Sequence, residues 1–113
     1  MVTRAWQRIE VTQEPAAIQF LVSELLYFEA RKLSVMAGHI VSGVIKPGMS
    51  LHIPTGSSLS VAIRIDGIEF LLKRSSNEEL VCLTHKCKRK TFERLESYSF
   101  VDQTLEITLA GTG

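Results

Sequence analysis

Residues 59–72 read LSVAIRIDGIEFLL and contain the clearest strand pattern in the chain. Apolar side chains occupy every second position as far as Ile65, and the alternation resumes at Ile68. A period of two predicts a strand that covers a core with one face. Asp66 and Gly67 interrupt the pattern, either as a hairpin turn or as a bulge within one long bent strand.

Further strand patterns lie on both sides of this stretch. Residues 49–53 and 105–109 alternate apolar and polar side chains, and residues 80–84 form a short apolar run. Turn-forming or polar segments at 55–58 and 74–79 separate them. Strands spaced by roughly 8 to 12 residues are typical of small barrels and sandwiches. We therefore predict an all-β fold, a small antiparallel barrel.

Residues 39–53 predict a hairpin. Residues 39–45 are a short stretch rich in β-branched side chains, and residues 49–53 form the next predicted strand. Between them, Lys46-Pro47-Gly48 is a tight turn, because proline fixes φ and glycine accepts a positive φ.

Residues 15–35 (PAAIQFLVSELLYFEARKLSV) fit two patterns. Ile18, Leu21, Val22 and Leu25 have helical spacing, and Pro15 suits the first turn of a helix. Ile18, Phe20 and Val22 also alternate, as in a strand. Periodicity alone favours the helix.

Length and composition limit the class of protein. The chain has 113 residues, which suits a single domain over 1–113. Its formal charge of +1 argues against a globally basic nucleic-acid binder, so a charged partner must be recognised locally. No apolar run approaches the roughly 18 residues of a membrane span, and residues 1–10 lack a signal-peptide core. We expect a soluble cytoplasmic protein without a membrane partner.

Residues 37–49 (AGHIVSGVIKPGM) resemble part of the β-barrel second domain of translational GTPases, such as elongation factor Tu. Residues 66–70 (DGIEF) are similar to that family's Gly-apolar-Glu-apolar segment, and the likeness covers roughly residues 18–84. It implies that residues 18–22 form a strand, that 66–67 form a bulge, and that 80–84 close the barrel. The family's turn glycines correspond here to Gly38, Gly43, Gly48 and Gly67.

The resemblance implies a non-enzymatic binding module that contacts RNA or a ribosome-associated protein. The sequence has no G-x-x-x-x-G-K-[ST] loop, so we expect no binding or hydrolysis of GTP by this chain. The alternative is a protein-interaction or oligomeric assembly module, in which a barrel edge or the Trp6-bearing N-terminus packs on another subunit.

A basic stretch, residues 85–94 (HKCKRKTFER), carries the strongest charge asymmetry. Its cations could contact phosphates, and its one aromatic ring could stack on a base. The alternative, which the sequence favours slightly, is a solvated strand end or loop whose lysines protect a barrel edge. The predicted RNA-binding residues are Lys86, Lys88, Arg89, Lys90, Phe92 and Arg94.

Catalytic and metal sites have weak support. Cys82 or Cys87 would need a base from His39, His52 or His85, and Cys82 lies in an apolar run that suits a buried side chain. A metal site at Cys82, His85 and Cys87 lacks a second ligand pair at zinc-finger spacing. The two cysteines are five residues apart, which on one strand places them on opposite faces and disfavours a disulfide. We expect no catalytic residues, metal or cofactor.

Overall fold

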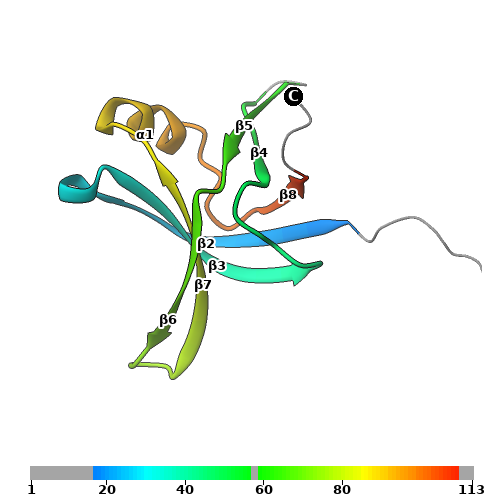
Figure 1. The fold of residues 1–113 in the computed structure, drawn as a ribbon, viewed down its shortest axis with the longest axis vertical. Helices are drawn as coiled ribbons and strands as arrows, with labels where there is room; N and C mark the ends of the chain where they lie inside the picture. Colours follow the sequence, from blue (N-terminus) through cyan, green and yellow to red (C-terminus); the bar gives the residue numbers. More distant parts are fainter. Residues whose placement is uncertain (1–16, 57–58, 110–113) are drawn as a thin grey trace, which may run out of the picture.

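The computed structural model describes residues 17–56 and 59–109. They form seven strands, a short 3-10 turn and one α-helix (Figure 1). In chain order the elements are β2 (Ile18–Phe28), η2 (Glu29–Arg31), β3 (Leu33–Ser42), β4 (Ser50–Pro54), β5 (Ser60–Arg64), β6 (Gly67–Lys73), β7 (Glu78–Lys86), α1 (Arg89–Glu96) and β8 (Thr104–Thr108). No helix in these described ranges is long and apolar enough to cross a membrane.

The strands form one antiparallel sheet in the order β5-β4-β8-β2-β3-β7-β6, which confirms the all-β prediction. β5 and β6 lie at opposite ends of this order, so the sheet is not closed into a barrel by a hydrogen-bonded ladder. These two strands are nevertheless consecutive and are joined by Ile65 and Asp66. The Ile65 N–H donates to the Met49 carbonyl at 2.8 Å, and the Asp66 N–H donates to the Thr84 carbonyl at 2.7 Å. The two ends of the curled sheet therefore meet at one bend, and a hairpin at 66–67 is excluded.

Residues 18–22, which the resemblance but not periodicity alone implied to be a strand, form the first part of β2, and the strand continues to Phe28. β2 pairs with β3 along its length and with β8 over Ile18 to Leu21. Backbone hydrogen bonds to β3 along the segment, and to β8 at its start, outweigh the weak helical spacing of its apolar residues. The ladder to β3 shifts register between Val22 and Glu24.

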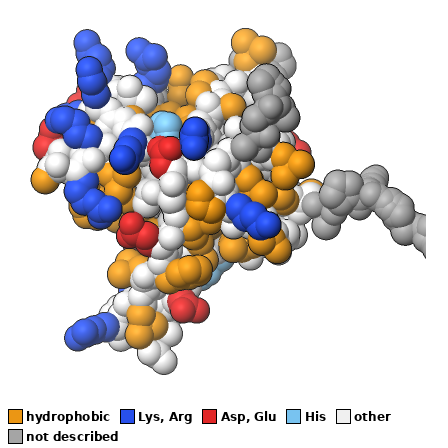
Figure 2. Space-filling view, viewed as in Figure 1, with side chains coloured by type: hydrophobic (Ala, Val, Ile, Leu, Met, Phe, Trp, Pro, Cys, Tyr) orange, Lys and Arg blue, Asp and Glu red, His pale blue; other side chains and the backbone are white. Residues whose placement is uncertain are grey.

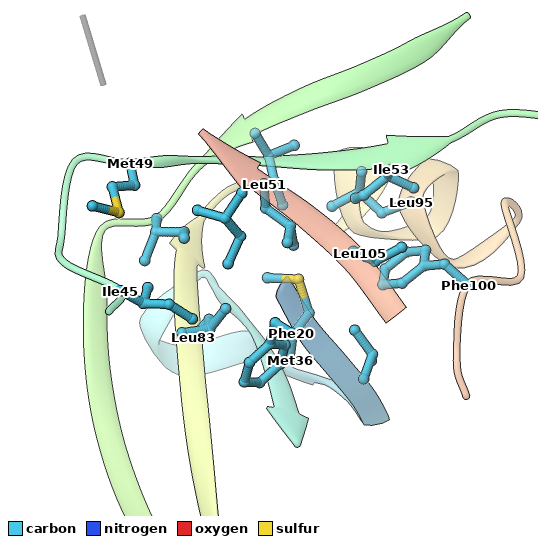
Figure 3. Packing of buried hydrophobic residues seen from close by; sticks show 14 residues of the cluster. Phe20, Met36, Ile45, Met49, Leu51, Ile53, Leu83, Leu95, Phe100 and Leu105 are labelled. Carbon is cyan, nitrogen blue, oxygen red and sulfur yellow. The ribbon is translucent and has the colours of Figure 1, made fainter. Parts of the chain in front are cut away.

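The predicted hairpin over residues 39–53 is wrong. The turn exists, because the Met49 N–H donates to the Lys46 carbonyl at 3.2 Å and Gly48 has φ +97°. However, β3 pairs with β2 and β7, whereas β4 pairs with β5 and β8. The connection buries Ile45 and Met49 in the core, as Figure 3 shows, and this apolar burial carries the chain away from β3.

Two of the predicted turn glycines are required by close contacts. A Cβ at Gly38 would overlap the carbonyl oxygen of Leu21 on the neighbouring strand β2. Gly43 has φ +84°, and a Cβ there would lie 2.9 Å from a side-chain carbon of Ile18. Both positions lie where β3 crosses or leaves β2, so only glycine fits without moving the backbone.

The main core lies inside the curl of the sheet (Figure 3). Its largest fully buried side chains include Phe20, Met36, Leu51 and Phe100. A second, smaller cluster lies on the other face of β3 and β7 and consists of Leu33, Val35, Ala37, Leu80 and Cys82. β3 is thus buried on both faces at its start, where six consecutive residues are inaccessible to solvent.

Candidate nucleic-acid interface

The basic stretch begins as the end of β7 and a short connection, as one interpretation of the sequence suggested, but from Arg89 onward it forms helix α1. Lys86 is the last residue of β7, and Lys88 is the N-cap of α1. Arg89, Lys90 and Arg94 lie within the helix. Figure 2 shows Lys and Arg side chains gathered around the end of the molecule where Figure 1 places α1.

Phe92 faces the protein interior, so the prediction that its ring stacks on a base is wrong. Only 5% of Phe92 is exposed, and its ring stacks on Tyr27 with the centroids 5.0 Å apart and the planes at 28°. Phe92 and Leu95 are three residues apart and form the buried face of the helix. The aromatic residue that the sequence offered as a ligand platform instead holds α1 against β2.

Arg89 is also occupied within the chain. Its Nε donates to the Glu29 carboxylate at 2.7 Å, and its guanidinium carbon lies 5.1 Å from the centroid of the Tyr27 ring. The hydrogen bond and the negative charge of Glu29 raise the pKa of Arg89 above its ordinary value. Arg89 therefore acts first as a link between α1 and the end of the β2–β3 hairpin.

Tyr27 is the residue that connects these contacts. Its hydroxyl donates to the Cys87 carbonyl at 2.9 Å, while the Cys87 N–H donates to the Lys32 carbonyl at 3.0 Å. Partial burial raises the pKa of the Tyr27 phenol, and Glu29 adds to this rise. Tyr27 and Phe92 are 65 positions apart, so no local sequence pattern could have paired them.

Four predicted cations remain available to a ligand. Lys86, Lys88, Lys90 and Arg94 are exposed, and none of their side chains forms an ion pair within residues 17–56 and 59–109. Lys90 and Arg94 are one helical turn apart, on the side of α1 away from Phe92. Glu93 and Glu96 also lie on this helix, so the surface is predominantly but not uniformly positive.

Other cations adjoin this surface but are paired. Arg31, in the turn after β2, lies 3.6 Å from Glu69, and Lys32 lies 3.9 Å from Glu29. Each of these cations lies beside a carboxylate, so the pairs add no net charge to this end of the molecule.

The histidines and cysteines are dispersed over the sheet. His39 Nε2 lies 2.8 Å from Glu78, His52 Nε2 lies 2.8 Å from the Thr108 hydroxyl, and His85 Nδ1 lies 2.8 Å from the Arg64 carbonyl. Cys82 and Cys87 are free thiols, and burial raises the pKa of Cys82. Within the described part of the chain, no group of three or more His, Cys, Asp or Glu residues could hold a metal ion.

The remaining predicted positions are spread over the fold. Gly48 lies in the turn before β4, and Gly67 is the first residue of β6. Trp6 lies outside the described residues. No known protein family, curated protein or solved structure matches this chain.

Proposed function

We propose that this chain is a non-enzymatic binding module that contacts RNA through Lys86, Lys88, Lys90 and Arg94. The observation that carries the proposal is that these four cations are exposed on and beside one short helix without an ion-pair partner in the described chain. Each such cation can replace condensed counterions at a phosphate, which is the main source of affinity for a polyanion. A local patch suffices for this, even in a protein with a net charge of +1.

The energetics of α1 support a role for these charges beyond folding. Lys88, Arg89 and Lys90 occupy the N-terminal end of the helix, where the macrodipole disfavours positive charge. The first turn contains no acidic residue, and the side chain of Lys88 makes no capping hydrogen bond. Lys90 and Arg94 are like charges four residues apart, which costs a few tenths of a kcal/mol. Lys88 and Lys90 therefore gain no stability from the helix dipole, whereas a bound phosphate chain would neutralise them.

The type of RNA-associated role comes from the sequence resemblance alone. Residues 37–49 and 66–70 resemble the barrel domain of translational GTPases, and a ribosome-associated RNA or protein is the partner that this implies. The chain lacks a phosphate-binding loop for GTP in its sequence, so any such role would be exercised without nucleotide hydrolysis by this chain.

Salt-dependent binding tests the proposal. A fluorescently labelled structured RNA is titrated with protein over roughly 50 to 200 mM salt, where phosphate contacts lose most affinity. We compare the wild type with the double variant Lys90→Ala/Arg94→Ala. Losing two phosphate contacts should weaken binding and flatten the log–log salt slope by about 1.5 units.

A variant with the same change in charge provides the control. Lys46 and Arg74 are exposed, lie in the turns before β4 and after β6, and form no ion pair in the described residues. Lys46→Ala/Arg74→Ala should leave the salt slope unchanged, because these cations lie outside the surface around α1. Equal affinity and slope for all three proteins would refute RNA binding through the cations of α1 and favour the protein-interaction alternative.

A further inference from the structure

β6 is an exposed edge of the sheet with an unusual composition. Within residues 17–56 and 59–109 it pairs only with β7, and its other side lies at the end of the strand order. Three consecutive large apolar residues are exposed along it: Phe70 at 69%, Leu71 at 49% and Leu72 at 55%. A long apolar edge presents unpaired backbone N–H and C=O groups and is a template for another strand.

β5, at the opposite end of the described strand order, carries the side chains of a protected edge. β5 has five residues, and its exposed positions include the small or charged Ser60, Ala62 and Arg64. Short length and polar side chains are the usual protection of an edge. β6 has seven residues and lacks this protection, so the two edges differ within one sheet.

Both faces of β6 are available to a partner. Phe70 and Leu72 point to one face, because side chains alternate along a strand. Glu69, Leu71 and Lys73 point to the other. Glu69 and Leu71 also line a groove of about 160 Å³ whose other walls include Leu26 of β2 and Val35 of β3.

We propose that β6 pairs with β6 of a second copy of this chain, antiparallel and centred on Leu71. In this register Leu71 lies opposite itself and Phe70 lies opposite Leu72. Glu69 lies opposite Lys73 twice, once on each side of the two-fold axis. The strand thus offers its own copy both an apolar centre and two charge pairs, and cross-strand pairs of these kinds stabilise antiparallel sheets.

The neighbouring registers lack this complementarity. Centring the pair on Phe70 leaves Lys73 opposite Gly67 and Glu69 opposite Leu71, so no charge is matched. Centring it on Glu69 places the two Glu69 carboxylates opposite each other, which is destabilising. A register that pairs an odd-numbered residue with an even-numbered one would place side chains from opposite faces of the two strands next to each other.

The charged residues of β6, Glu69 and Lys73, form only exposed ion pairs within the described chain. Arg31 lies 3.6 Å from Glu69, and Lys73 lies 3.5 Å from Glu24. All four side chains are about half exposed, and such pairs contribute little. Exchanging these partners for those of a second copy therefore costs little stability. This association is independent of RNA, because β6 and the cations of α1 are separate surfaces.

Sedimentation or light scattering over a dilution series tests the pairing without RNA. The wild type should form a dimer that dissociates on dilution. Leu71→Lys places two like charges at the centre of the interface and should produce a monomer. Ala62→Lys makes a similar change on β5 and should leave the dimer intact. A wild type that stays monomeric at every concentration, or a dimer that Leu71→Lys leaves intact, overturns the proposal.

Charge reversal tests the register. Glu69→Lys and Lys73→Glu should each weaken the dimer about tenfold, because each opposes like charges twice. The Glu69→Lys/Lys73→Glu double variant restores opposite charges across the interface and should restore the wild-type dissociation constant. Within one chain, the same double variant places like charges beside Arg31 and Glu24. It should therefore restore the dimer without raising the unfolding free energy above that of the single variants. Failure of the double variant to dimerise would overturn this register.

Discussion

The guanidinium of Arg89 lies between the carboxylate of Glu29, at 2.7 Å, and the ring of Tyr27, 5.1 Å from the centroid. This arrangement joins the first turn of α1 to the end of the β2–β3 hairpin. It separates Arg89 from the other cations of the helix, which make no such contacts in the described residues.

Arg89→Ala should therefore lower the free energy of unfolding more than Lys90→Ala does. The first change removes a charge-assisted hydrogen bond and a cation–π contact, whereas the second removes only an exposed charge. Urea unfolding of both variants, together with Glu29→Ala and the Glu29→Ala/Arg89→Ala pair, measures the coupling. Strictly additive effects of Glu29→Ala and Arg89→Ala would show that the contact contributes nothing.

Phe92→Ala should destabilise the protein by about 3 kcal/mol, because it removes a buried ring and its stacking on Tyr27. Phe92→Leu keeps most of the apolar volume and should cost about half as much. Urea denaturation measures both changes. A Phe92→Ala variant with wild-type stability and impaired RNA binding would instead restore the base-stacking role that its burial argues against.

The strands that the sequence predicts correctly are those with one buried and one exposed face. β4, β5 and β8 each cover the core with one face, so their alternating side chains indicated strands at 49–53, 59–65 and 105–109. β3 is buried on both faces over its first six residues, which removes the alternation that marks a strand. Its pairing with β2 and β7, instead of β4, depends on contacts that are distant in sequence.

The candidate site was predictable in its charges and not in its architecture. The cations at 86–94 were found because charge is read directly from residue type. α1 has only eight residues, and its buried face consists of Phe92 and Leu95, which is too little periodicity to distinguish a helix within a basic stretch. The side chains that position it, Tyr27 and Glu29, come from a segment 60 or more residues earlier.

Gly38→Ala should cost about 3 kcal/mol of stability or prevent folding. Its Cβ would overlap the Leu21 carbonyl oxygen and lie 2.9 Å from the carbonyl carbon, and paired backbone on β2 cannot move aside easily. Gly56→Ala is the control, because a Cβ there meets no atom within 4 Å and only the φ of +90° is unfavourable. It should cost about 1 kcal/mol. Similar thermal midpoints for the two variants would contradict the close approach at Gly38.

Alkaline pH should lower the free energy of unfolding because it ionises Tyr27. Partial burial raises the pKa of its phenol, and the hydroxyl donates to the Cys87 carbonyl, so the folded state favours the protonated form. The resulting stability is fully present below the ordinary pKa of about 10 and is lost as pH rises through the folded-state pKa. Tyr27→Phe cannot ionise and should lack this loss. If the unfolding free energies of the wild type and Tyr27→Phe fall in parallel as pH rises, Tyr27 is not the cause of the alkaline loss of stability.

Lys88→Asp should separate the role of this residue in binding from its role in folding. Lys88 is the N-cap of α1, has extended backbone angles and makes no side-chain cap. An aspartate there can accept a hydrogen bond from a free N–H of the first turn and interacts favourably with the macrodipole. We expect unfolding free energy to rise by about 1 kcal/mol while RNA affinity falls. Lys88→Ala, which removes the charge without adding a cap, should weaken RNA binding with little change in stability. A more stable Lys88→Asp variant that binds RNA as tightly as the wild type would remove Lys88 from the interface, because the gain in stability would already show that its helix is intact.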